Sequence, residues 1–328
     1  MSHRVVSAEG VRAAAARLSG VAAATPLLEF EALNARVGGR VLVKAETLQH
    51  GGSFKFRGAW NRLSSLTEAE RRRGVLAWSS GNHALGVALA GKRLAIPSTI
   101  VMPSDAPRIK ADQVRALGAE IIAYDRARED REAIGRRVAA ERGLALAPSY
   151  DHPDIIEGQG TVALEAVAQA RAMGAAIDVF VICCGGGGLA AGCATILEEI
   201  SPATAVAIAE PEGYDETWAS IRAGRRLVND VARKTLCDAI ATPTPGELTF
   251  PILQRRVSLG ATVSDADVGA AMAYAFRTLK LVVEPGGAAA LAAVLAGKVD
   301  VKGKVVAVTL SGGNVDPGVY QGVLAGHA

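Results

Sequence analysis

Short apolar runs alternate with longer amphipathic or alanine-rich stretches along most of the chain. The apolar runs predict β-strands at residues 41–43, 75–78, 98–102, 120–124, 178–184, 205–209 and 305–310. The longer stretches predict helices at about 8–18, 54–65, 84–94, 107–117, 126–142, 161–173, 189–199 and 265–279, with another after Pro285. Residues 151–160 and 242–246 are expected to form loops. Strands that alternate with helices predict an α/β fold whose parallel sheets carry helices on both faces.

Glycine- and serine-rich stretches follow the expected strands at four places. They are residues 52–59, 79–83, 185–188 and 311–314. Ligands in parallel α/β folds bind beyond the carboxyl ends of the strands. We therefore expect a ligand site at these strand ends.

The first of these stretches contains Lys55 between Phe54 and Phe56. A lysine among aromatic side chains loses hydration, which lowers its pKa. Such a lysine can act as a nucleophile that forms a Schiff base. The alternative is an ordinary lysine that extends to solvent from a helix start while the two phenylalanines anchor the core. These residues alone leave both interpretations open.

Two further stretches have the form of anion-binding loops. Residues 79–83 precede a helix whose free N–H groups can attract a carboxylate, and the alternative is an ordinary helix cap. The four glycines at 185–188 leave backbone N–H groups open to a phosphate, which the dipole of the next helix favours. They do not match the nucleoside-triphosphate loop G-x-x-x-x-G-K-S/T. A dinucleotide loop and a plain tight turn are the alternatives for this tetrad.

Composition narrows the class of protein. The 328 residues allow two domains, and 50% hydrophobic residues with 36 glycines indicate a globular protein with close packing of helices on sheets. A net charge of +3, with both signs interspersed, predicts no nucleic-acid or membrane partner. The four cysteines form no CxxC pair, and the charged stretch from Arg4 to Arg17 does not resemble a signal peptide. We expect a soluble, cytoplasmic protein, because four glycines disfavour a membrane helix within the uncharged residues 179–197.

The four stretches have the sequences Ser-Phe-Lys-Phe-Arg-Gly, Ser-Ser-Gly-Asn-His, the glycine tetrad and Ser-Gly-Gly-Asn, in that order. In this order the chain resembles fold-type II pyridoxal-phosphate enzymes, in the branch of threonine/serine dehydratases and serine racemases. Residues 158–161 and 284–286 extend the resemblance nearly from end to end. It implies two three-layer domains with parallel sheets and pyridoxal 5'-phosphate in the cleft between them. We expect a large domain of residues 1–73 and 144–328, a small inserted domain of residues 74–143, and a homodimer.

The resemblance also implies roles for individual residues. Lys55 resembles the lysine that binds the cofactor and removes the α-proton of the substrate, and Ser80 resembles the serine that faces the substrate from the opposite side in racemases. The other cofactor contacts that it implies are Phe54, Asn82, Gly185, Gly186, Gly187, Gly188, Leu189 and Ser311. It places the substrate carboxylate at Ser79, Ser80, Asn82 and His83. Ser311 is matched to the pyridine nitrogen, where a neutral hydroxyl moderates the electron sink and suits elimination.

Two further matches concern the edges of the expected site. Glu210, Glu216 and the carbonyl of Tyr214 resemble the divalent-cation site of serine racemases, and oxygen ligands suit Mg²⁺ or Ca²⁺. Family members often have Asp at the position of Glu216, and the alternative is a solvated acidic loop. Arg131 resembles a substrate-side arginine of serine racemases. The alternative for Arg131 is an exposed helix residue paired with nearby carboxylates.

These matches predict β-elimination from a hydroxy amino acid with pyridoxal phosphate. The expected activity is L-threonine or L-serine ammonia-lyase, which gives a 2-oxo acid and ammonia, because His83 stands where the O-acetylserine branch usually has threonine. The chain extends 14 residues beyond Asn314, which predicts a catabolic enzyme without a regulatory domain. One alternative is a 3-hydroxyaspartate dehydratase or a serine racemase, which Arg131 and the cation site would favour. Another is a catalytically silent pyridoxal-phosphate carrier.

Overall fold

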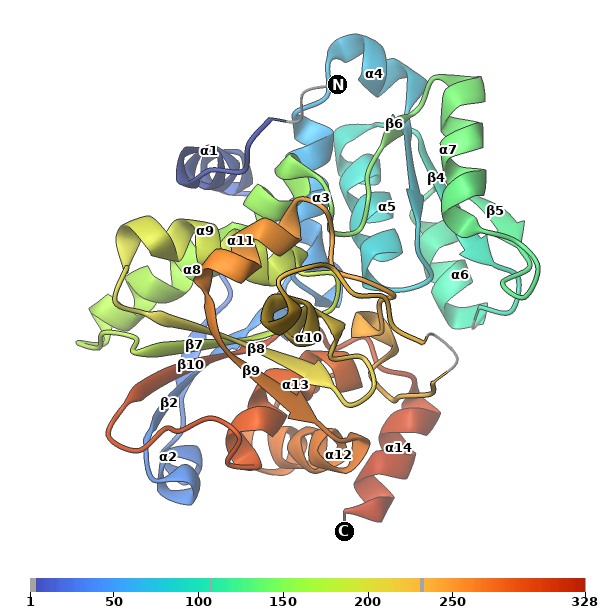
Figure 1. Cartoon of the computed structure of the whole chain (residues 1–328). Coiled ribbons are helices and arrows are strands. Elements are labelled where there is room, and N and C mark those ends of the chain that lie inside the picture. The colour runs from blue at the N-terminus through green and yellow to red at the C-terminus, as the bar shows by residue number, and fades with distance from the viewer. Residues whose placement is uncertain (1–3, 107, 231–232, 328) are drawn as a thin grey trace.

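The computed structural model describes residues 4–106, 108–230 and 233–327. Within these ranges the strands form a six-stranded sheet and a four-stranded sheet (Figure 1). The large sheet has the order β1 (Leu27–Glu29), β2 (Arg40–Ala45), β10 (Val305–Leu310), β7 (Val179–Cys183), β8 (Ala205–Pro211) and β9 (Val257–Val263). The small sheet has the order β5 (Glu120–Tyr124), β4 (Ser98–Pro103), β3 (Val75–Trp78) and β6 (Ala145–Leu146). The pairs are parallel apart from β1–β2, so the expected α/β fold with parallel sheets is confirmed.

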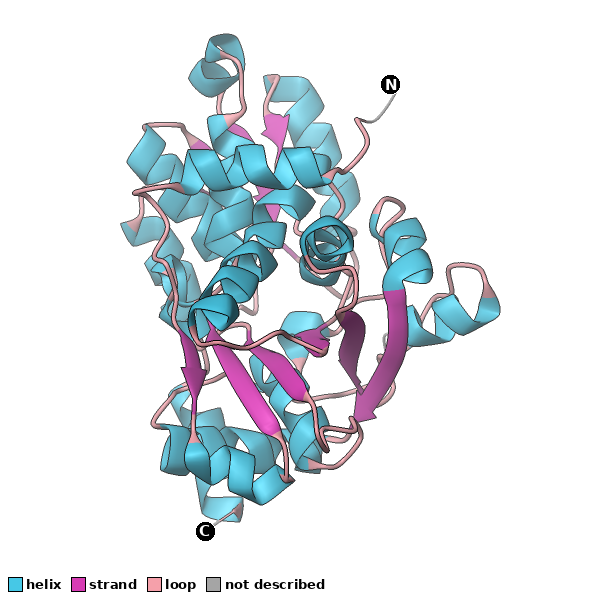
Figure 2. Cartoon of the chain, turned by 90° about the vertical axis from the view of Figure 1, so that its left-hand side faces the viewer, coloured by secondary structure: helices cyan, strands magenta, loops and turns pink. Residues whose placement is uncertain are grey.

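Helices cover both faces of the large sheet. Alternate residues of β2 show how the faces divide, because Val41 and Val43 belong to one apolar cluster and Leu42 belongs to another. The first cluster includes residues of α2 (Glu31–Val37), α12 (Asp265–Tyr274) and α13 (Pro285–Leu295). The second includes residues of α1 (Ala8–Leu18), α8 (Pro153–Ala172), α9 (Gly188–Ile200) and α11 (Thr249–Arg256). Figure 2 shows the strands between these helical layers.

The strands of the small sheet come from one continuous stretch of chain, at the upper right of Figure 1. On one face of this sheet, α5 (Asn82–Leu94) and α3 (Lys55–Ser64) share an apolar cluster with the strands. On the other face, α7 (Arg131–Arg142) covers Leu76 and Trp78. We propose that residues 74–143 form an inserted domain between 1–73 and 144–328, with β6 pairing onto β3 just beyond that range.

The largest difference from the sequence expectation concerns residues 151–160, where the predicted loop is wrong. Helix α8 begins at Pro153, a favourable first residue for a helix. Gly158 and Gly160 lie within this helix, and their lack of a side chain lets α8 pack very close to its neighbours α3 and α9. A Cβ on Gly158 would lie only 2.6 Å from the Cα of Gly58. These glycines suggest a loop from the sequence, but they permit close contact between helices.

Other differences lie at element ends and in polar segments. Helix α7 begins at Arg131 rather than near residue 126, because the Asp130 carboxylate caps it by accepting hydrogen bonds from two N–H groups of the first turn. Helix α12 ends at Tyr274 and continues as a π-helical turn. The short helix α4 (Glu68–Arg73) begins with a capping box formed by Thr67 and Glu70. Elements that the sequence did not predict include α2, α10 (Glu216–Ala223), α11, α14 (Pro317–Gly326), β6 and β9.

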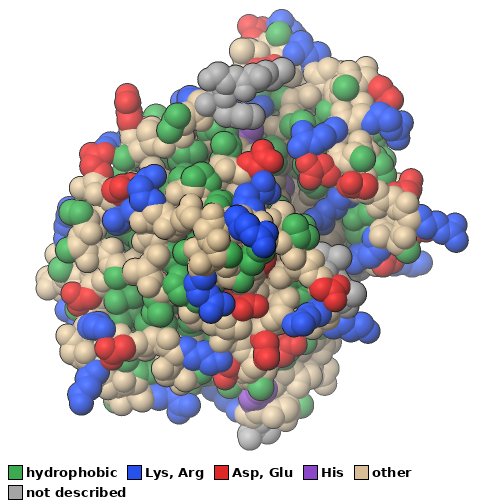
Figure 3. All heavy atoms as spheres, in the orientation of Figure 1, with side chains coloured by type: hydrophobic (Ala, Val, Ile, Leu, Met, Phe, Trp, Pro, Cys, Tyr) green, Lys and Arg blue, Asp and Glu red, His purple; other side chains and the backbone are tan. Residues whose placement is uncertain are grey.

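The distribution of surface charge and the lengths of the apolar helices match what the composition predicts. Lys and Arg side chains are interspersed with Asp and Glu on the face shown in Figure 3. In the part of the chain that the structure describes, no helix has the length and apolar character needed to cross a membrane. Residues 179–197 form β7, the glycine loop and most of α9. The four cysteines are buried free thiols.

Candidate active site

A pocket lies where the loops at the carboxyl ends of the two sheets meet. Its walls come from the starts of α3, α5, α7 and α9, from α6 (Arg108–Ala116) and from the short turn η3 (Asp238–Ile240). The predicted site residues that line it are Phe54, Lys55, Ser79, Ser80, Asn82, His83, Arg131, Gly186, Gly187, Gly188, Leu189 and Ser311. Gly185 instead packs against Ile240, whose carbonyl oxygen would lie 2.8 Å from a Cβ on this glycine. The structure therefore brings together the predicted cofactor and substrate residues apart from Gly185.

Lys55 is the first residue of α3, and its ammonium group lies in the pocket. Its Nζ donates a hydrogen bond of 2.7 Å to the carbonyl of Ser149 and lies 5.1 Å from the centre of the Phe54 ring. Loss of hydration lowers the pKa of Lys55 from its ordinary value of 10.5 to about 8, although the Glu284 carboxylate opposes this shift. Part of the amine population is therefore neutral just above pH 7, as a nucleophile or a general base requires.

The loop before α3 is fixed to the loop after β10, which carries Ser311. The N–H of Phe54 donates a hydrogen bond of 3.1 Å to the carbonyl of Ser311, and Ser53 forms a β-bridge with Gly312. Ser311 itself is 4% exposed. These backbone contacts place the Lys55 amine and the Ser311 hydroxyl in the same pocket.

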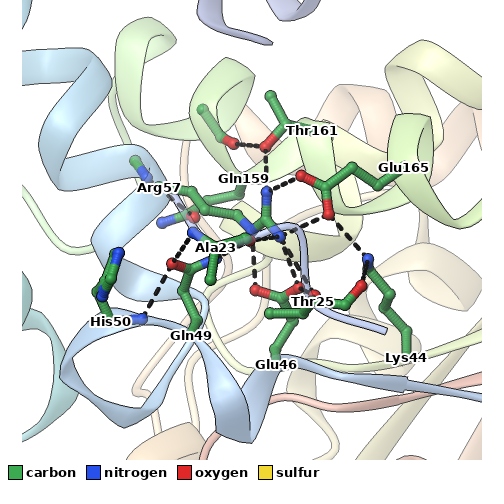
Figure 4. Close-up of polar contacts among 12 residues, drawn as sticks. Ala23, Thr25, Lys44, Glu46, Gln49, His50, Arg57, Gln159, Thr161 and Glu165 are labelled. Atoms are coloured by element: carbon green, nitrogen blue, oxygen red, sulfur yellow. Dashed lines mark hydrogen bonds and ion pairs between the residues drawn. The ribbon is translucent and has the colours of Figure 1, made fainter. Parts of the chain in front are cut away.

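A buried charge network holds the first turn of α3 (Figure 4). Arg57 donates from Nε to Glu46 at 2.8 Å and from Nη1 to Glu165 at 2.6 Å. Lys44 donates from Nζ to the other oxygen of Glu165 at 2.8 Å. The four side chains are two cations and two carboxylates, so the network is neutral as a whole. Because a buried arginine is tolerated only when it is paired, the network ties α3 to β2 and α8 just beyond Lys55.

The glycine loop before α9 provides N–H groups for an anion. Gly187 has a φ of 91°, in the left-handed region, and α9 begins at Gly188. The first N–H groups of a helix have no acceptor within it and carry partial positive charge, which suits a phosphate. A Cβ on Gly186 would lie 2.5 Å from the Tyr150 ring, and one on Gly188 would lie 2.9 Å from the Cβ of Tyr150. Glycine is therefore required here by close packing as well as by backbone conformation.

Asn82 joins the small sheet to the large one across the pocket. Its Nδ2 donates a hydrogen bond of 2.5 Å to Oε1 of Glu284, and its Oδ1 accepts one of 2.8 Å from Asn314. The second N–H of Nδ2 can still donate to a ligand. The Glu284 carboxyl is buried, and this burial raises its pKa to about 7 against the opposing effect of the Asn82 hydrogen bond.

His83 lines the pocket with its ring in a single tautomer. Its Nε2 lies 2.7 Å from the carbonyl of Ala147, which can only accept, so Nε2 carries the proton. Nδ1 is then the acceptor, and within the described residues it has no partner. Burial, together with the charge of Lys55, lowers the pKa of His83 to about 3, so the ring is neutral at physiological pH. A carboxylate would therefore meet the N–H groups at the start of α5 rather than a charged imidazole.

Arg131 reaches the pocket from the first turn of α7. Its nearest carboxylates in sequence have other contacts, because Asp130 caps the helix and Glu132 pairs with Arg136 at 2.5 Å. Lys110 reaches the pocket from α6 and lies 3.7 Å from Oδ2 of Asp238.

Sequence reasoning assigned no role to several residues that line the pocket. They are Trp78, Lys110, Ser149, Tyr150, Cys183 and Glu284. Glu284 was part of a recognised motif, which was a usable signal. Lys110, Ser149 and Tyr150 belong to no motif, and only tertiary contacts bring them here.

The predicted cation ligands lie at the end of β8 and the start of α10. Glu210 accepts hydrogen bonds from the N–H groups of Thr217 and Trp218, at 3.0 and 2.8 Å. Burial raises the pKa of Glu210 well above its ordinary value, and the neighbouring charge of Glu216 adds to this effect. Burial also raises the pKa of Glu216 to about 7. In residues 4–106, 108–230 and 233–327 there is no group of three or more His, Cys, Asp or Glu side chains that could hold a metal ion. The site would therefore need the carbonyl of Tyr214 or water to complete it.

The comparison with known proteins agrees with this geometry. A family model described as "Pyridoxal-phosphate dependent enzyme" matches residues 18–312. L-threo-3-hydroxyaspartate ammonia-lyase of Pseudomonas sp is 42% identical over 313 residues, which cover 95% of this chain and 97% of that protein. L-threonine ammonia-lyase of Thermotoga maritima is 36% identical over 320 residues, which cover 98% of this chain and 78% of that protein. The solved structure of maize serine racemase matches with a TM-score of 0.91 and 34% identity, covering 99% of this chain and 98% of that one. This chain therefore belongs to the family of pyridoxal-phosphate dependent enzymes that its motifs indicate.

Proposed function

We propose that this protein converts 3-hydroxyaspartate to oxaloacetate and ammonia by β-elimination. The sequence alone favours L-threonine or L-serine as the substrate. The 3-hydroxyaspartate activity proposed here was the alternative to that expectation. The observation that carries the choice is Arg131, which lines the pocket while the carboxylates beside it on α7 have other contacts. A guanidinium can pair with a carboxylate through two parallel hydrogen bonds, whereas the side chains of threonine and serine offer it no charge. The name of the Pseudomonas relative supports the same substrate.

The pocket fits pyridoxal phosphate. The Lys55 amine, the free N–H groups at the start of α9 and the Ser311 hydroxyl are an amine nucleophile, an anion cradle and a neutral hydrogen-bond partner in one cavity. We infer that Lys55 holds the cofactor covalently, that Gly186 to Gly188 hold its phosphate, and that Ser311 faces its ring nitrogen. When bound, the cofactor supplies the electron sink that stabilises negative charge at the substrate α-carbon.

The protein's own groups orient the substrate and move its protons. The N–H groups and hydroxyls of residues 79–83 bind the α-carboxylate, and Arg131 binds the β-carboxylate. Neutral Lys55 removes the α-proton, and its lowered pKa suits that task near neutral pH. His83, which lines the pocket as a neutral ring, adds no positive charge beside the substrate. The hydrogen bond from Asn82 to Glu284 links the small-sheet side of the pocket to the large-sheet side.

Two other activities have specific support. The Thermotoga relative supports threonine elimination, which needs the same Lys55 and no Arg131. The maize structure and the position of Ser80 in the pocket support racemisation, which needs an acid–base group on each face of the α-carbon. We propose that Ser80→Ala abolishes any inversion of serine while elimination persists. A catalytically silent pyridoxal-phosphate carrier is disfavoured, because both acid–base candidates, Lys55 and Ser80, are present in the pocket. The homodimer and the cytoplasmic location stay predictions from the sequence.

A substrate panel tests the proposal. L-threo- and erythro-3-hydroxyaspartate, L-threonine, L-serine and D-serine are each scored for 2-oxo acid release and for inversion. The hydroxyaspartates should give the highest kcat/KM. Arg131→Ala should lower kcat/KM for hydroxyaspartate by about ten- to a hundredfold, as expected for the loss of a charged hydrogen-bond partner, while threonine turnover changes little.

The matched control is Arg128→Ala, since Arg128 is an exposed arginine just before α7 that pairs with Asp125 at 3.6 Å. This variant should behave as wild type on each substrate. Equal small losses on threonine and hydroxyaspartate in Arg131→Ala would mark Arg131 as a surface residue. A wild-type preference for threonine would overturn the proposal outright.

A further inference from the structure

We propose that Lys110 is a specificity-determining residue and that Asp238 occupies its ammonium in place of the second carboxylate of the substrate. In this scheme a dicarboxylic substrate displaces Asp238 from Lys110, whereas a monocarboxylic one leaves the Asp238–Lys110 pair intact. The inference rests on the proposed function and assigns to its site a second cation besides Arg131.

The position of the pair is the first observation that supports this exchange. Lys110 lies on α6, beside the small sheet, and Asp238 lies in η3, beside the large one. Both line the pocket, and their charged atoms are 3.7 Å apart. Among the ion pairs of the described residues, this is the one that joins residues 75–146 to the rest of the chain. It therefore links the two sides of the pocket that contains Lys55.

The pair is also weak enough to be replaced. A separation of 3.7 Å is too long for a normal hydrogen bond between an ammonium and a carboxylate. The Asp238 side chain is 73% exposed, whereas that of Lys110 is 23% exposed. Released Asp238 would remain hydrated, whereas Lys110 without an anion would be an unpaired cation with only 23% of its side chain exposed. An incoming carboxylate satisfies Lys110 and costs Asp238 little, because exposed ion pairs contribute little.

Charge balance makes the exchange selective. Lys110 and Arg131 are two cations on the small-sheet side of the pocket, and Asp238 neutralises one of them. A β-carboxylate bound at Lys110 can take over this role. A methyl or a hydrogen at that position cannot displace Asp238, because Lys110 would then lose its counter-ion. Asp238 thus competes with dicarboxylates specifically.

Calorimetric titration of the cofactor-loaded protein with succinate and with propionate tests the competition. Succinate carries two carboxylates but cannot undergo elimination, and propionate carries one. Asp238→Asn should tighten succinate binding by about two- to fivefold, which corresponds to the loss of an exposed competing pair, and should leave propionate unchanged. Lys110→Gln should weaken succinate by about tenfold. In a protein that already carries Lys110→Gln, adding Asp238→Asn should not change succinate affinity any further. KM for hydroxyaspartate should follow these shifts while kcat changes less than about twofold.

Asp112→Asn is the charge-matched control, because Asp112 lies on the same helix and pairs with Arg115 at 3.0 Å. It should alter neither titration. Weaker or unchanged succinate binding in Asp238→Asn would overturn the inference, as would an equal tightening in Asp112→Asn. If hydroxyaspartate is not a substrate, the proposed function fails, but the succinate titrations still decide the role of Lys110. If hydroxyaspartate is turned over and Asp238→Asn is silent, only this inference fails.

Discussion

Lys55 combines a fixed position with an amine that is partly neutral near physiological pH. Loss of hydration in the pocket, opposed by Glu284, leaves its pKa at about 8. The neutral amine is the nucleophile, so the rate at which cofactor-free protein captures pyridoxal phosphate should rise with pH and level off above about pH 8. Stopped-flow absorbance from pH 6 to 10 measures this rate. If the rate levelled off only near pH 10.5, the ordinary pKa of lysine, the pKa shift would be contradicted.

Lys55→Ala should lose both the visible absorbance of the bound cofactor and turnover.

Glu284 should make the stability of the cofactor-free protein depend on pH. Burial raises its pKa from 4.5 to about 7, so the folded state favours the protonated form. The stabilising contribution is complete below the unfolded pKa, near 4.5, and is lost as pH rises through about 7. Glu284→Gln keeps an acceptor for Asn82 and removes this titration.

Urea unfolding at pH 5 and pH 8 provides the measurement. The free energy of unfolding should fall less between these pH values in Glu284→Gln than in wild type, by a difference on the order of 2–3 kcal/mol. Burial also raises the pKa of Glu216 to about 7, so the variant should retain some pH dependence. Identical pH profiles for the two proteins would show that Glu284 titrates normally.

At the scale of elements, the Arg57 network decides how firmly α3 is held. Arg57→Met would leave Glu46 as a fully buried carboxylate without its partner, while Glu165 keeps Lys44. Breaking a buried pair in this way costs about 3–5 kcal/mol. Chemical denaturation should show that loss in Arg57→Met and a partial recovery in Arg57→Met with Glu46→Gln.

The control for this prediction is Arg12→Met, which breaks a surface pair with Glu199 at 2.6 Å. That change should cost less than about 1 kcal/mol, because both partners are solvated. Similar small losses in Arg57→Met and Arg12→Met would mean that the network does not hold α3.

The range of the interactions that form an element decides whether its sequence predicts it. Strands β3 and β10 are buried on both faces, so their apolar runs identify them without reference to the rest of the chain. Strand β9 escaped prediction because its register is set by pairing with β8, from Val206 to Pro211. The start of α8 was predicted as loop because the use of its glycines depends on contact with α3.

Within the site, too, features that depend on local sequence are predictable, whereas features that depend on distant contacts are not. Glycines and serines at strand ends serve the backbone conformation of their own loops, so they form motifs that a single sequence displays. Lys110 and Tyr150 contribute to the pocket only because two separate sheets bring them there. The tautomer of His83 depends on the Ala147 carbonyl, 64 residues away in the chain. Motifs therefore indicate where the chemistry lies, whereas protonation states and specificity require the tertiary structure.

At the scale of the whole molecule, polar contacts join the two sheets across the pocket. Asn82 bonds to Glu284 and to Asn314, and Lys110 pairs with Asp238. Ligand groups that form hydrogen bonds or ion pairs can replace such contacts one for one. Movement of the small sheet toward the large one on substrate binding would then exclude water from the reacting atoms.

The stability of the protein should respond to divalent cations at the predicted site after β8. Glu210 and Glu216 are both buried, and burial raises the pKa of each because the charged form is poorly solvated. A divalent cation would stabilise both ionised carboxylates, and a ligand that binds only the folded state raises its melting temperature. We therefore expect Mg²⁺ or Ca²⁺ to raise Tm at pH 8 and chelation to lower it.

Glu216→Gln should remove this response, because one carboxylate and one carbonyl hold a hard cation weakly. Glu212→Gln is the matched control, since Glu212 lies in the same loop but is exposed. It should respond to cations as wild type does. A Tm that is insensitive to chelation and to both cations in the wild type would leave the Glu210–Glu216 pair as a structural element that Thr217, Trp218, Thr242 and Asn229 satisfy by hydrogen bonds alone.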